Sequence, residues 1–157
     1  MHFPIIQLCD TRKKSREDRI TEFSFYDDKT VEYFTDYVGD TYTDKKRAEY
    51  LREDYLKKLF EGIADVDDTG KITFFSEEKI RETLRQEYKA VLDKLQENLQ
   101  EGHLRGYNFR SAGEYFRDDE TMFYYESCTQ SSGAFMEDTV YFAGKTLYVG
   151  AIIDAHI

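Results

Sequence analysis

Apolar residues recur at two different spacings along this chain, and each spacing predicts a different kind of element. Over two long segments they stand three or four residues apart, which predicts amphipathic helices. We expect the first helix to follow a Thr43 cap and to run to about residue 63. We expect the second to follow a Ser76 cap and to end at Gly102. At about 1.5 Å per residue it would be roughly 37 Å long, which predicts a helix that lies along the whole molecule or, alternatively, binds a partner.

Shorter segments either alternate between apolar and polar residues or form short apolar or β-favouring runs, and both patterns predict strands. We expect strands at residues 3–9, 20–26, 72–75, 121–128, 134–142 and 147–157. The last strand should bury one face against the core, because its apolar residues occupy every second position. These residues are Leu147, Val149, Ala151, Ile153, Ala155 and Ile157. We also expect a charged loop at residues 10–19 and a short helix at 31–38, capped by Thr30 and ended by Gly39.

Together these elements predict an α+β fold, because strands and helices do not alternate as they do in a doubly wound parallel sheet. We expect a mostly antiparallel sheet of about 5–6 strands whose last three form a C-terminal meander. The two long helices should pack against one face of this sheet. The chain has 157 residues with one Pro and nine Gly, so residues 1–157 are predicted to form a single domain without a flexible linker.

The segment DVDDTGKIT, residues 65–73, begins like the calcium-binding loop of an EF-hand. Oxygen-bearing side chains occupy the first, third and fifth positions, and Gly70 occupies the sixth. The last position, however, is Ser76 instead of a bidentate glutamate, and the chain has no second loop of this kind. We therefore interpret the segment as a turn in which Gly70 adopts a positive φ and leads into a strand. A degenerate calcium site over residues 65–77 is the alternative hypothesis.

The composition favours a folded protein. Aromatic residues make up 16% of the chain, with 13 Tyr and 12 Phe, which is too many for a disordered protein even with 34% charged residues. No apolar run is long enough to cross a bilayer, and the N-terminal MHFPIIQLCD lacks the basic start of a signal peptide. These features predict a cytoplasmic protein that does not bind membranes.

The formal net charge of −10 is distributed unevenly. Residues 1–19 contain five basic and three acidic residues, so they carry +2, and residues 20–157 carry the remaining −12. A body of this charge repels nucleic acid and attracts basic partners. We interpret the basic segment as a solvated loop, with local contact to phosphates as the alternative.

Few groups in the chain suggest catalysis or metal binding. The sequence has no P-loop, Rossmann glycine pattern, nucleophile elbow, HExxH or CxxC motif, and we expect no cofactor or metal. We interpret Cys9 and Cys128 as two buried small apolar residues, with a disulfide or a reactive thiol as alternatives. If the meander forms, Cys128 could lie near Asp154 and His156. A small enzyme that uses Cys128 and His156 is therefore a further hypothesis.

Acidic and tyrosine residues are interleaved over residues 22–42, where Lys29 is the single basic residue. Like charges held close together cost stability, so binding of a cationic partner is one reason to keep them. Tyrosines add contact area at a small cost in conformational entropy. A solvated acidic face is the alternative. The residues expected to bind the partner are Glu22, Asp27, Asp28, Glu32, Tyr33, Asp36, Tyr37 and Asp40.

The leading functional hypothesis is therefore a non-catalytic, acidic interaction protein. It would cover a basic surface of a protein partner, such as a nuclease or a nucleic-acid-binding protein, without binding nucleic acid itself. Immunity proteins and DNA-mimicking inhibitors of defence enzymes use the same electrostatic logic. The analogy rests on charge and not on a motif.

Overall fold

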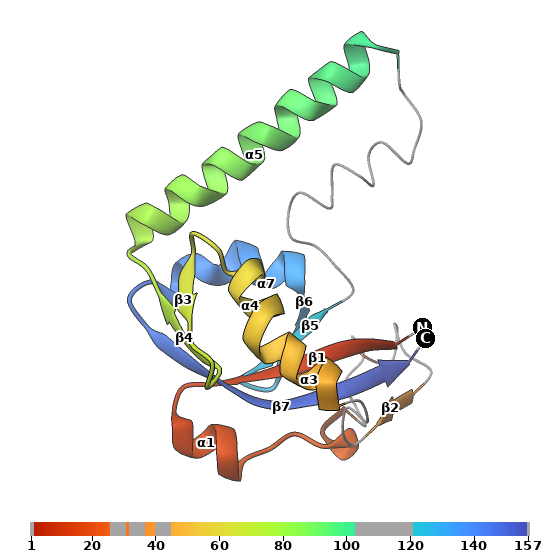
Figure 1. Ribbon diagram of the computed structural model, residues 1–157, viewed down its shortest axis with the longest axis vertical. Helices are drawn as coiled ribbons and strands as arrows, with labels where there is room; N and C mark the ends of the chain where they lie inside the picture. The colour runs from red at the N-terminus through yellow and green to blue at the C-terminus, as the bar shows by residue number, and fades with distance from the viewer. Residues whose placement is uncertain (1, 26–30, 32–36, 40–44, 103–120, 157) are drawn as a thin grey trace.

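A computed structural model of the chain describes residues 2–25, 31, 37–39, 45–102 and 121–156 (Figure 1). In these ranges no helix combines the length and the apolar character needed to cross a membrane. The elements, in chain order, are β1 (His2–Cys9), α1 (Arg12–Glu17), the 3₁₀ helix η1 (Glu22–Phe25), β2 (Tyr37–Gly39), α3 (Lys45–Tyr50), the π-helical η2 (Leu51–Tyr55), α4 (Leu56–Leu59), β3 (Ala64–Val66), β4 (Lys71–Phe74), α5 (Glu77–Gln100), β5 (Met122–Tyr125), β6 (Cys128–Ser131), α7 (Ser132–Asp138), the 3₁₀ helix η3 (Thr139–Phe142) and β7 (Thr146–His156).

The described strands form one mixed sheet in the order β3-β4-β7-β1-β5-β6, with β2 paired to the far end of β7. The prediction of an α+β fold is confirmed, but the sheet is mixed instead of mostly antiparallel, because its central β1–β5 pair is parallel. The predicted C-terminal meander is wrong as well. The chain leaves β6, crosses the sheet through α7 and η3, and returns as β7 on the opposite side of β1 (Figure 1).

Residues 134–142, predicted to be a strand, are helical for local reasons. The Ser131 side chain caps α7 by accepting a hydrogen bond from the Ala134 amide at 3.2 Å. Phe135 and Met136 of α7 and Phe142 of η3 are all buried in the larger hydrophobic cluster. The Ser131 cap is the local signal that distinguishes this helix from the predicted strand.

The long strand β7 contains a bulge that changes which face its side chains point to. Ile6 pairs with Ile152, but Leu8 pairs with Val149, so β7 carries one extra residue opposite Gln7. Leu147 and Val149 therefore pack in one hydrophobic cluster. Ile153 and Ala155 pack in a second cluster on the other face of the sheet. The prediction that the apolar residues of this strand all share one face is thus wrong.

Helices and turns cover both faces of the sheet. The larger cluster joins β1, β4, β5 and β7 to the helices α4 and α7, with Phe60 at its centre. The Phe60 ring lies 5.9 Å from Phe123 and 6.2 Å from Phe135, measured between ring centroids. The smaller cluster packs Phe3 and Ile5 of β1 against residues of the 20–31 segment. The prediction of two long helices on one face therefore described only part of the packing.

The segment after β1 differs from its prediction at three places. Residues 10–19 contain the helix α1, capped by the Thr11 side chain, instead of a loop. Residues 22–25 form η1 instead of a strand, because the Ser24 hydroxyl accepts from the Thr21 amide at 3.0 Å and closes a tight turn. Tyr37–Gly39 form strand β2, so no helix extends to residue 38. Apart from Val31, the rest of that predicted helix lies outside the described residues.

The two long helical segments are confirmed, but the second is placed differently from the prediction. The first is helical from Lys45 to Leu59, and its predicted cap lies outside the described residues. The second, α5, starts after Ser76, whose side chain accepts from the Lys79 amide. Its N-terminal half contacts η3 and lines a cavity together with α7 and η3, and its later turns project away from the sheet (Figure 1). Leu92 and Leu99 accordingly remain 64% and 61% exposed. Val91, in the second half of the helix, is nevertheless buried.

Candidate functional site

The structure describes two of the residues predicted to bind a partner. Glu22 is half-buried at the start of η1, and Tyr37 begins strand β2. These two elements lie against each other beside the C-terminal end of β7. Asp27, Asp28, Glu32, Tyr33, Asp36 and Asp40 lie outside the described residues, so their role stays a prediction.

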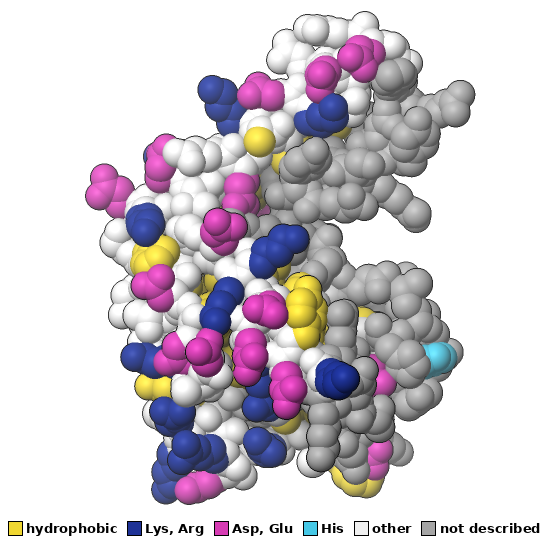
Figure 2. Space-filling model, in the orientation of Figure 1, with side chains coloured by type: hydrophobic (Ala, Val, Ile, Leu, Met, Phe, Trp, Pro, Cys, Tyr) yellow, Lys and Arg dark blue, Asp and Glu magenta, His cyan; other side chains and the backbone are white. Residues whose placement is uncertain are grey.

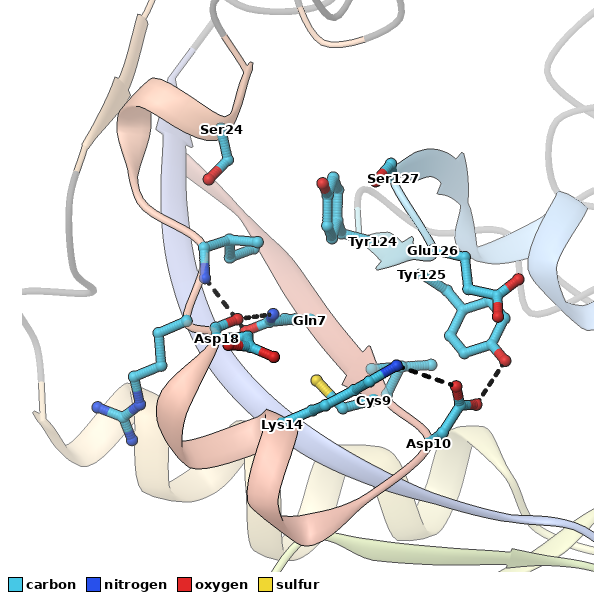
Figure 3. A pocket seen from close by; sticks show the side chains of 13 residues that line it. Gln7, Cys9, Asp10, Lys14, Asp18, Ser24, Tyr124, Tyr125, Glu126 and Ser127 are labelled. Atoms are coloured by element: carbon cyan, nitrogen blue, oxygen red, sulfur yellow. Dashed lines mark hydrogen bonds and ion pairs between the residues drawn. The ribbon is translucent and has the colours of Figure 1, made fainter.

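A polar pocket of about 420 Å³ lies next to η1, where β1 and β5 end side by side (Figure 3). We call it the β1–β5 pocket. Its walls come from the end of β1, from α1 and the residues after it, from η1, and from the turn between β5 and β6. The carboxyl ends of adjacent parallel strands are a common position for ligand sites, because the loops that follow diverge there.

One side of the pocket is built around the Tyr125 hydroxyl. It donates a hydrogen bond of 2.6 Å to Oδ1 of Asp10, a residue 115 positions earlier in the chain. The Lys14 ammonium lies 3.7 Å from Asp10 Oδ2, which is an ion pair but too long for a hydrogen bond. Figure 3 shows Glu126 beside the same hydroxyl. Burial, then Asp10 and then Glu126 raise the pKa of Tyr125, so the phenol keeps its proton at neutral pH.

Glu126 and Ser127 form the turn of the β5–β6 hairpin at the edge of the pocket. Both have positive φ angles, 47° and 64°, as a two-residue type I′ turn requires. Such positions favour Asn and Gly, because a larger side chain crowds its own backbone there. The chain therefore holds a glutamate at the pocket in a conformation that glutamate disfavours.

Gln7 and Cys9 point from β1 to the base of the pocket (Figure 3). The Gln7 amide donates to the Asp18 carbonyl at 2.6 Å, and its oxygen accepts from the amides of Ile20 and Ala151. It thereby fixes the segment after α1 over the bulge of β7. Cys9 is only 6% exposed, and burial together with the charge of Asp10 raises the pKa of its thiol. A protonated thiol is a poor nucleophile.

The pocket combines neutral weak acids with charged groups. Cys9 and Tyr125, two of the weak acids that line it, have raised pKa values and stay neutral at pH 7. Among the described residues that line it there is no histidine to serve as a base near neutral pH. The groups it presents are hydrogen-bond donors, acceptors and charges.

The DVDDTGKIT segment forms the hairpin turn between β3 and β4, which confirms the turn interpretation. Gly70 has a φ of +75°. Asp67 Oδ1 accepts from the Thr69 amide at 2.8 Å, from the Thr69 hydroxyl at 2.6 Å and from the Lys71 amide at 3.1 Å. These contacts lower the pKa of Asp67. Asp68 pairs with Lys57. Within the described ranges, no group of three or more His, Cys, Asp or Glu residues is arranged to hold a metal ion.

The suggested Cys–His–Asp group does not form. Cys128 pairs with Tyr125 beside the C-terminal end of β1, whereas His156 pairs with His2 at the N-terminal end of β1. The two residues therefore lie at opposite ends of the sheet. Both cysteines are free thiols, and Cys128 is exposed, so the prediction that both are buried is right for Cys9 alone.

Sequence reasoning missed the β1–β5 pocket. The local pattern predicts a solvated loop at Asp10 and Lys14 and a continuous strand through Glu126. The one available signal was the polar pair Glu126-Ser127 between two β-favouring runs. Its connection to Asp10 depends on the parallel pairing of β1 and β5, which local spacing does not encode.

Comparisons with protein-family models, with curated proteins and with solved structures found no significant match to this chain.

Proposed function

We propose that this protein is a non-catalytic, acidic interaction protein that binds a basic surface of another protein. The partner would be a nuclease or another nucleic-acid-binding protein, because those proteins present basic surfaces of the required size. The acidic segment 22–42 would provide the main contact.

The separation of charge supports this proposal. The basic residues of the N-terminal segment are exposed on and after α1, and Lys and Arg side chains gather at that lower end of the molecule in Figure 2. Residues 20–157 carry −12. A molecule with its charges separated in this way attracts and orients a basic partner before contact.

The single observation that carries the choice of surface is the position of η1 and β2. These elements contain the first and last described parts of the 22–42 segment, and they lie against each other. Phe25 and Val31 are both buried in the smaller hydrophobic cluster. The described parts of the acidic segment thus lie beside the C-terminal end of β7 and are attached there by apolar residues.

An experiment with matched charge changes tests the proposal. A partner is first captured from cell extract with the immobilised protein and eluted with salt. The triple variant Glu32→Gln, Asp36→Asn and Asp40→Asn should then associate roughly tenfold more slowly and show a weaker salt dependence, because electrostatic steering is lost. Surface plasmon resonance at several salt concentrations measures both quantities.

The control removes the same charge elsewhere, with Asp54→Asn, Glu78→Gln and Asp93→Asn on exposed helical positions. It should retain most of the association rate. Equal losses in both triple variants would show that net charge matters but that segment 22–42 is not the contact surface.

A further inference from the structure

We propose that the β1–β5 pocket receives an arginine side chain from the basic partner. The source of the arginine rests on the function proposed above, whereas the affinity of the pocket for a guanidinium group is a separate property of the described residues. The pocket borders the proposed contact surface, because Ile20 and Ser24 line it just before and within η1.

Two carboxylates share one hydrogen-bond donor at this site. Asp10 accepts the proton of the Tyr125 hydroxyl, and Glu126 approaches the same hydroxyl. One phenol has a single proton to donate, so acceptor oxygens outnumber donors. The Lys14 ammonium lies 3.7 Å from Asp10 Oδ2, too far for a hydrogen bond, and the Asp10 side chain is 41% exposed, so this oxygen is open to a ligand from solvent. A cationic group with several N–H donors would satisfy these oxygens.

The base of the pocket provides an independent indication of a ligand. Cys9 is 6% exposed and lines the cavity, and its thiol makes no hydrogen bond to any described residue. Buried polar atoms in folded proteins usually have a partner. A sulfur atom accepts hydrogen bonds weakly, so an N–H group that enters the cavity would pair with it.

The shape of the site favours guanidinium over ammonium. Tyr124 and Tyr125 both line the pocket, but Tyr124 packs on Phe25 at one face of the sheet and Tyr125 packs on Phe142 at the other. A planar guanidinium stacks on aromatic rings and donates in two directions at once, toward Asp10 and toward Glu126. A volume of about 420 Å³ exceeds what one such group fills and leaves space for the aliphatic part of the side chain.

Lys14 and Arg19 are basic residues that also line the pocket and oppose a second cation. Lys14 occupies the position that the ligand needs, at the side of Asp10. Its ammonium is largely exposed and held at long range, so it moves away at little cost. The three carboxylates of Asp10, Asp18 and Glu126 still exceed these two positive charges.

Short model compounds test the pocket without any partner. The full-length protein is titrated with N-acetyl-arginine methylamide, and amide chemical shifts are followed by NMR. N-acetyl-citrulline methylamide has nearly the same shape without the charge, and N-acetyl-lysine methylamide has the charge without the planar group. We expect shifts at residues 7–10 and 124–127 with the arginine compound, at least tenfold weaker binding of the citrulline compound, and intermediate binding of the lysine compound.

Three substitutions link the binding to the named residues. Asp10→Asn should weaken arginine binding about tenfold while still accepting the Tyr125 hydrogen bond. Glu126→Asn should also weaken it, yet raise the melting temperature, because Asn is favoured at this turn position. A variant that is more stable but binds less cannot owe the loss to unfolding. Lys14→Gln should strengthen binding, since it removes the competing cation.

Glu17→Gln provides the matched control, because it removes one exposed carboxylate from α1 outside the pocket and should leave arginine binding unchanged. Equal affinities for the arginine and citrulline compounds would overturn the proposal, and so would unchanged binding in both Asp10→Asn and Glu126→Asn. These results do not depend on segment 22–42. The protein could bind the arginine compound while its 22–42 variants still bind the partner normally. That result would reject segment 22–42 as the contact surface and would support the pocket as an arginine site.

Discussion

Gln7 and Gly150 together form the contact that stabilises the bulge of β7. The Gln7 side chain lies directly over Gly150, where an added Cβ would be 2.4 Å from Gln7 Oε1 and 2.8 Å from Gln7 Cδ. Gln7 has little freedom to move, because its amide group is bonded to Asp18, Ile20 and Ala151. A glycine at this position therefore serves close packing and not an unusual backbone angle.

We expect Gly150→Ala to lower the free energy of unfolding by about 1–3 kcal/mol, because the new methyl group overlaps a fixed side chain. Urea unfolding followed by circular dichroism measures this change. The double variant with Gln7→Ala should lose at least about 1 kcal/mol less than the sum of the two single variants. Additive losses would mean that the two residues do not act on each other.

The helices differ in how firmly the sheet holds them. In η2, Arg52 donates from Nη2 to the Gly150 carbonyl at 3.2 Å and so connects the α3–α4 segment to the bulge. Burial and the charge of Arg19 lower the pKa of Arg52. Helix α5 has fewer such contacts. It is held near its start by the buried Ile80 and by Thr83, whose hydroxyl donates to the Gly62 carbonyl at 2.9 Å.

This difference predicts opposite results for two similar truncations in α5. Ile80→Ala should cost about 2–5 kcal/mol of stability, because Ile80 is fully buried in the larger cluster. Leu92→Ala should change stability by less than about 0.5 kcal/mol, because that side chain is 64% exposed. Chemical denaturation of both variants checks this, and a large loss in Leu92→Ala would show that the Leu92 side chain is packed in solution.

At the level of the entire molecule, the ionisable groups of the pocket make the free energy of unfolding depend on pH in the alkaline range. The pKa of Tyr125 is raised above its ordinary value of 10.0 in the folded protein, chiefly by burial and then by Asp10. A raised pKa means that the folded state holds its proton more tightly than the unfolded chain does. The resulting stability is complete below about pH 10 and is lost as the pH rises toward the folded-state value. Cys9 contributes in the same direction above its ordinary value of 9.0.

We therefore expect the free energy of unfolding to fall between about pH 9.5 and 11.5, and to fall less steeply in Tyr125→Phe, which has no phenol to ionise. Asp10→Asn should give an intermediate slope, because it removes one cause of the raised pKa and leaves the burial. Urea titrations at several pH values measure the slopes. Identical slopes in Tyr125→Phe and the unaltered protein would contradict the prediction.

Features set by neighbouring residues could be predicted from the sequence. Ser76 and the apolar spacing after it determined where α5 begins and ends, and Gly70 determined the β3–β4 turn, because caps and turns depend on a few adjacent positions. The strand pattern of residues 3–9 and 147–157 was equally readable. These local rules do not determine which face of a helix or strand packs against the rest of the protein. The position of α5 relative to the sheet was therefore not predictable from them.

Only the tertiary structure decided what these elements form together. The bulge opposite Gln7 switches the face of β7 halfway along the strand, so one alternating pattern serves two hydrophobic clusters. The parallel pairing of β1 with β5 brings Asp10 to Tyr125 across 115 residues and creates the pocket. The sequence determined the charge of this protein and its two long helical segments. Long-range strand pairing decided which carboxylates line the β1–β5 pocket, because pairing energies depend on packing between distant segments.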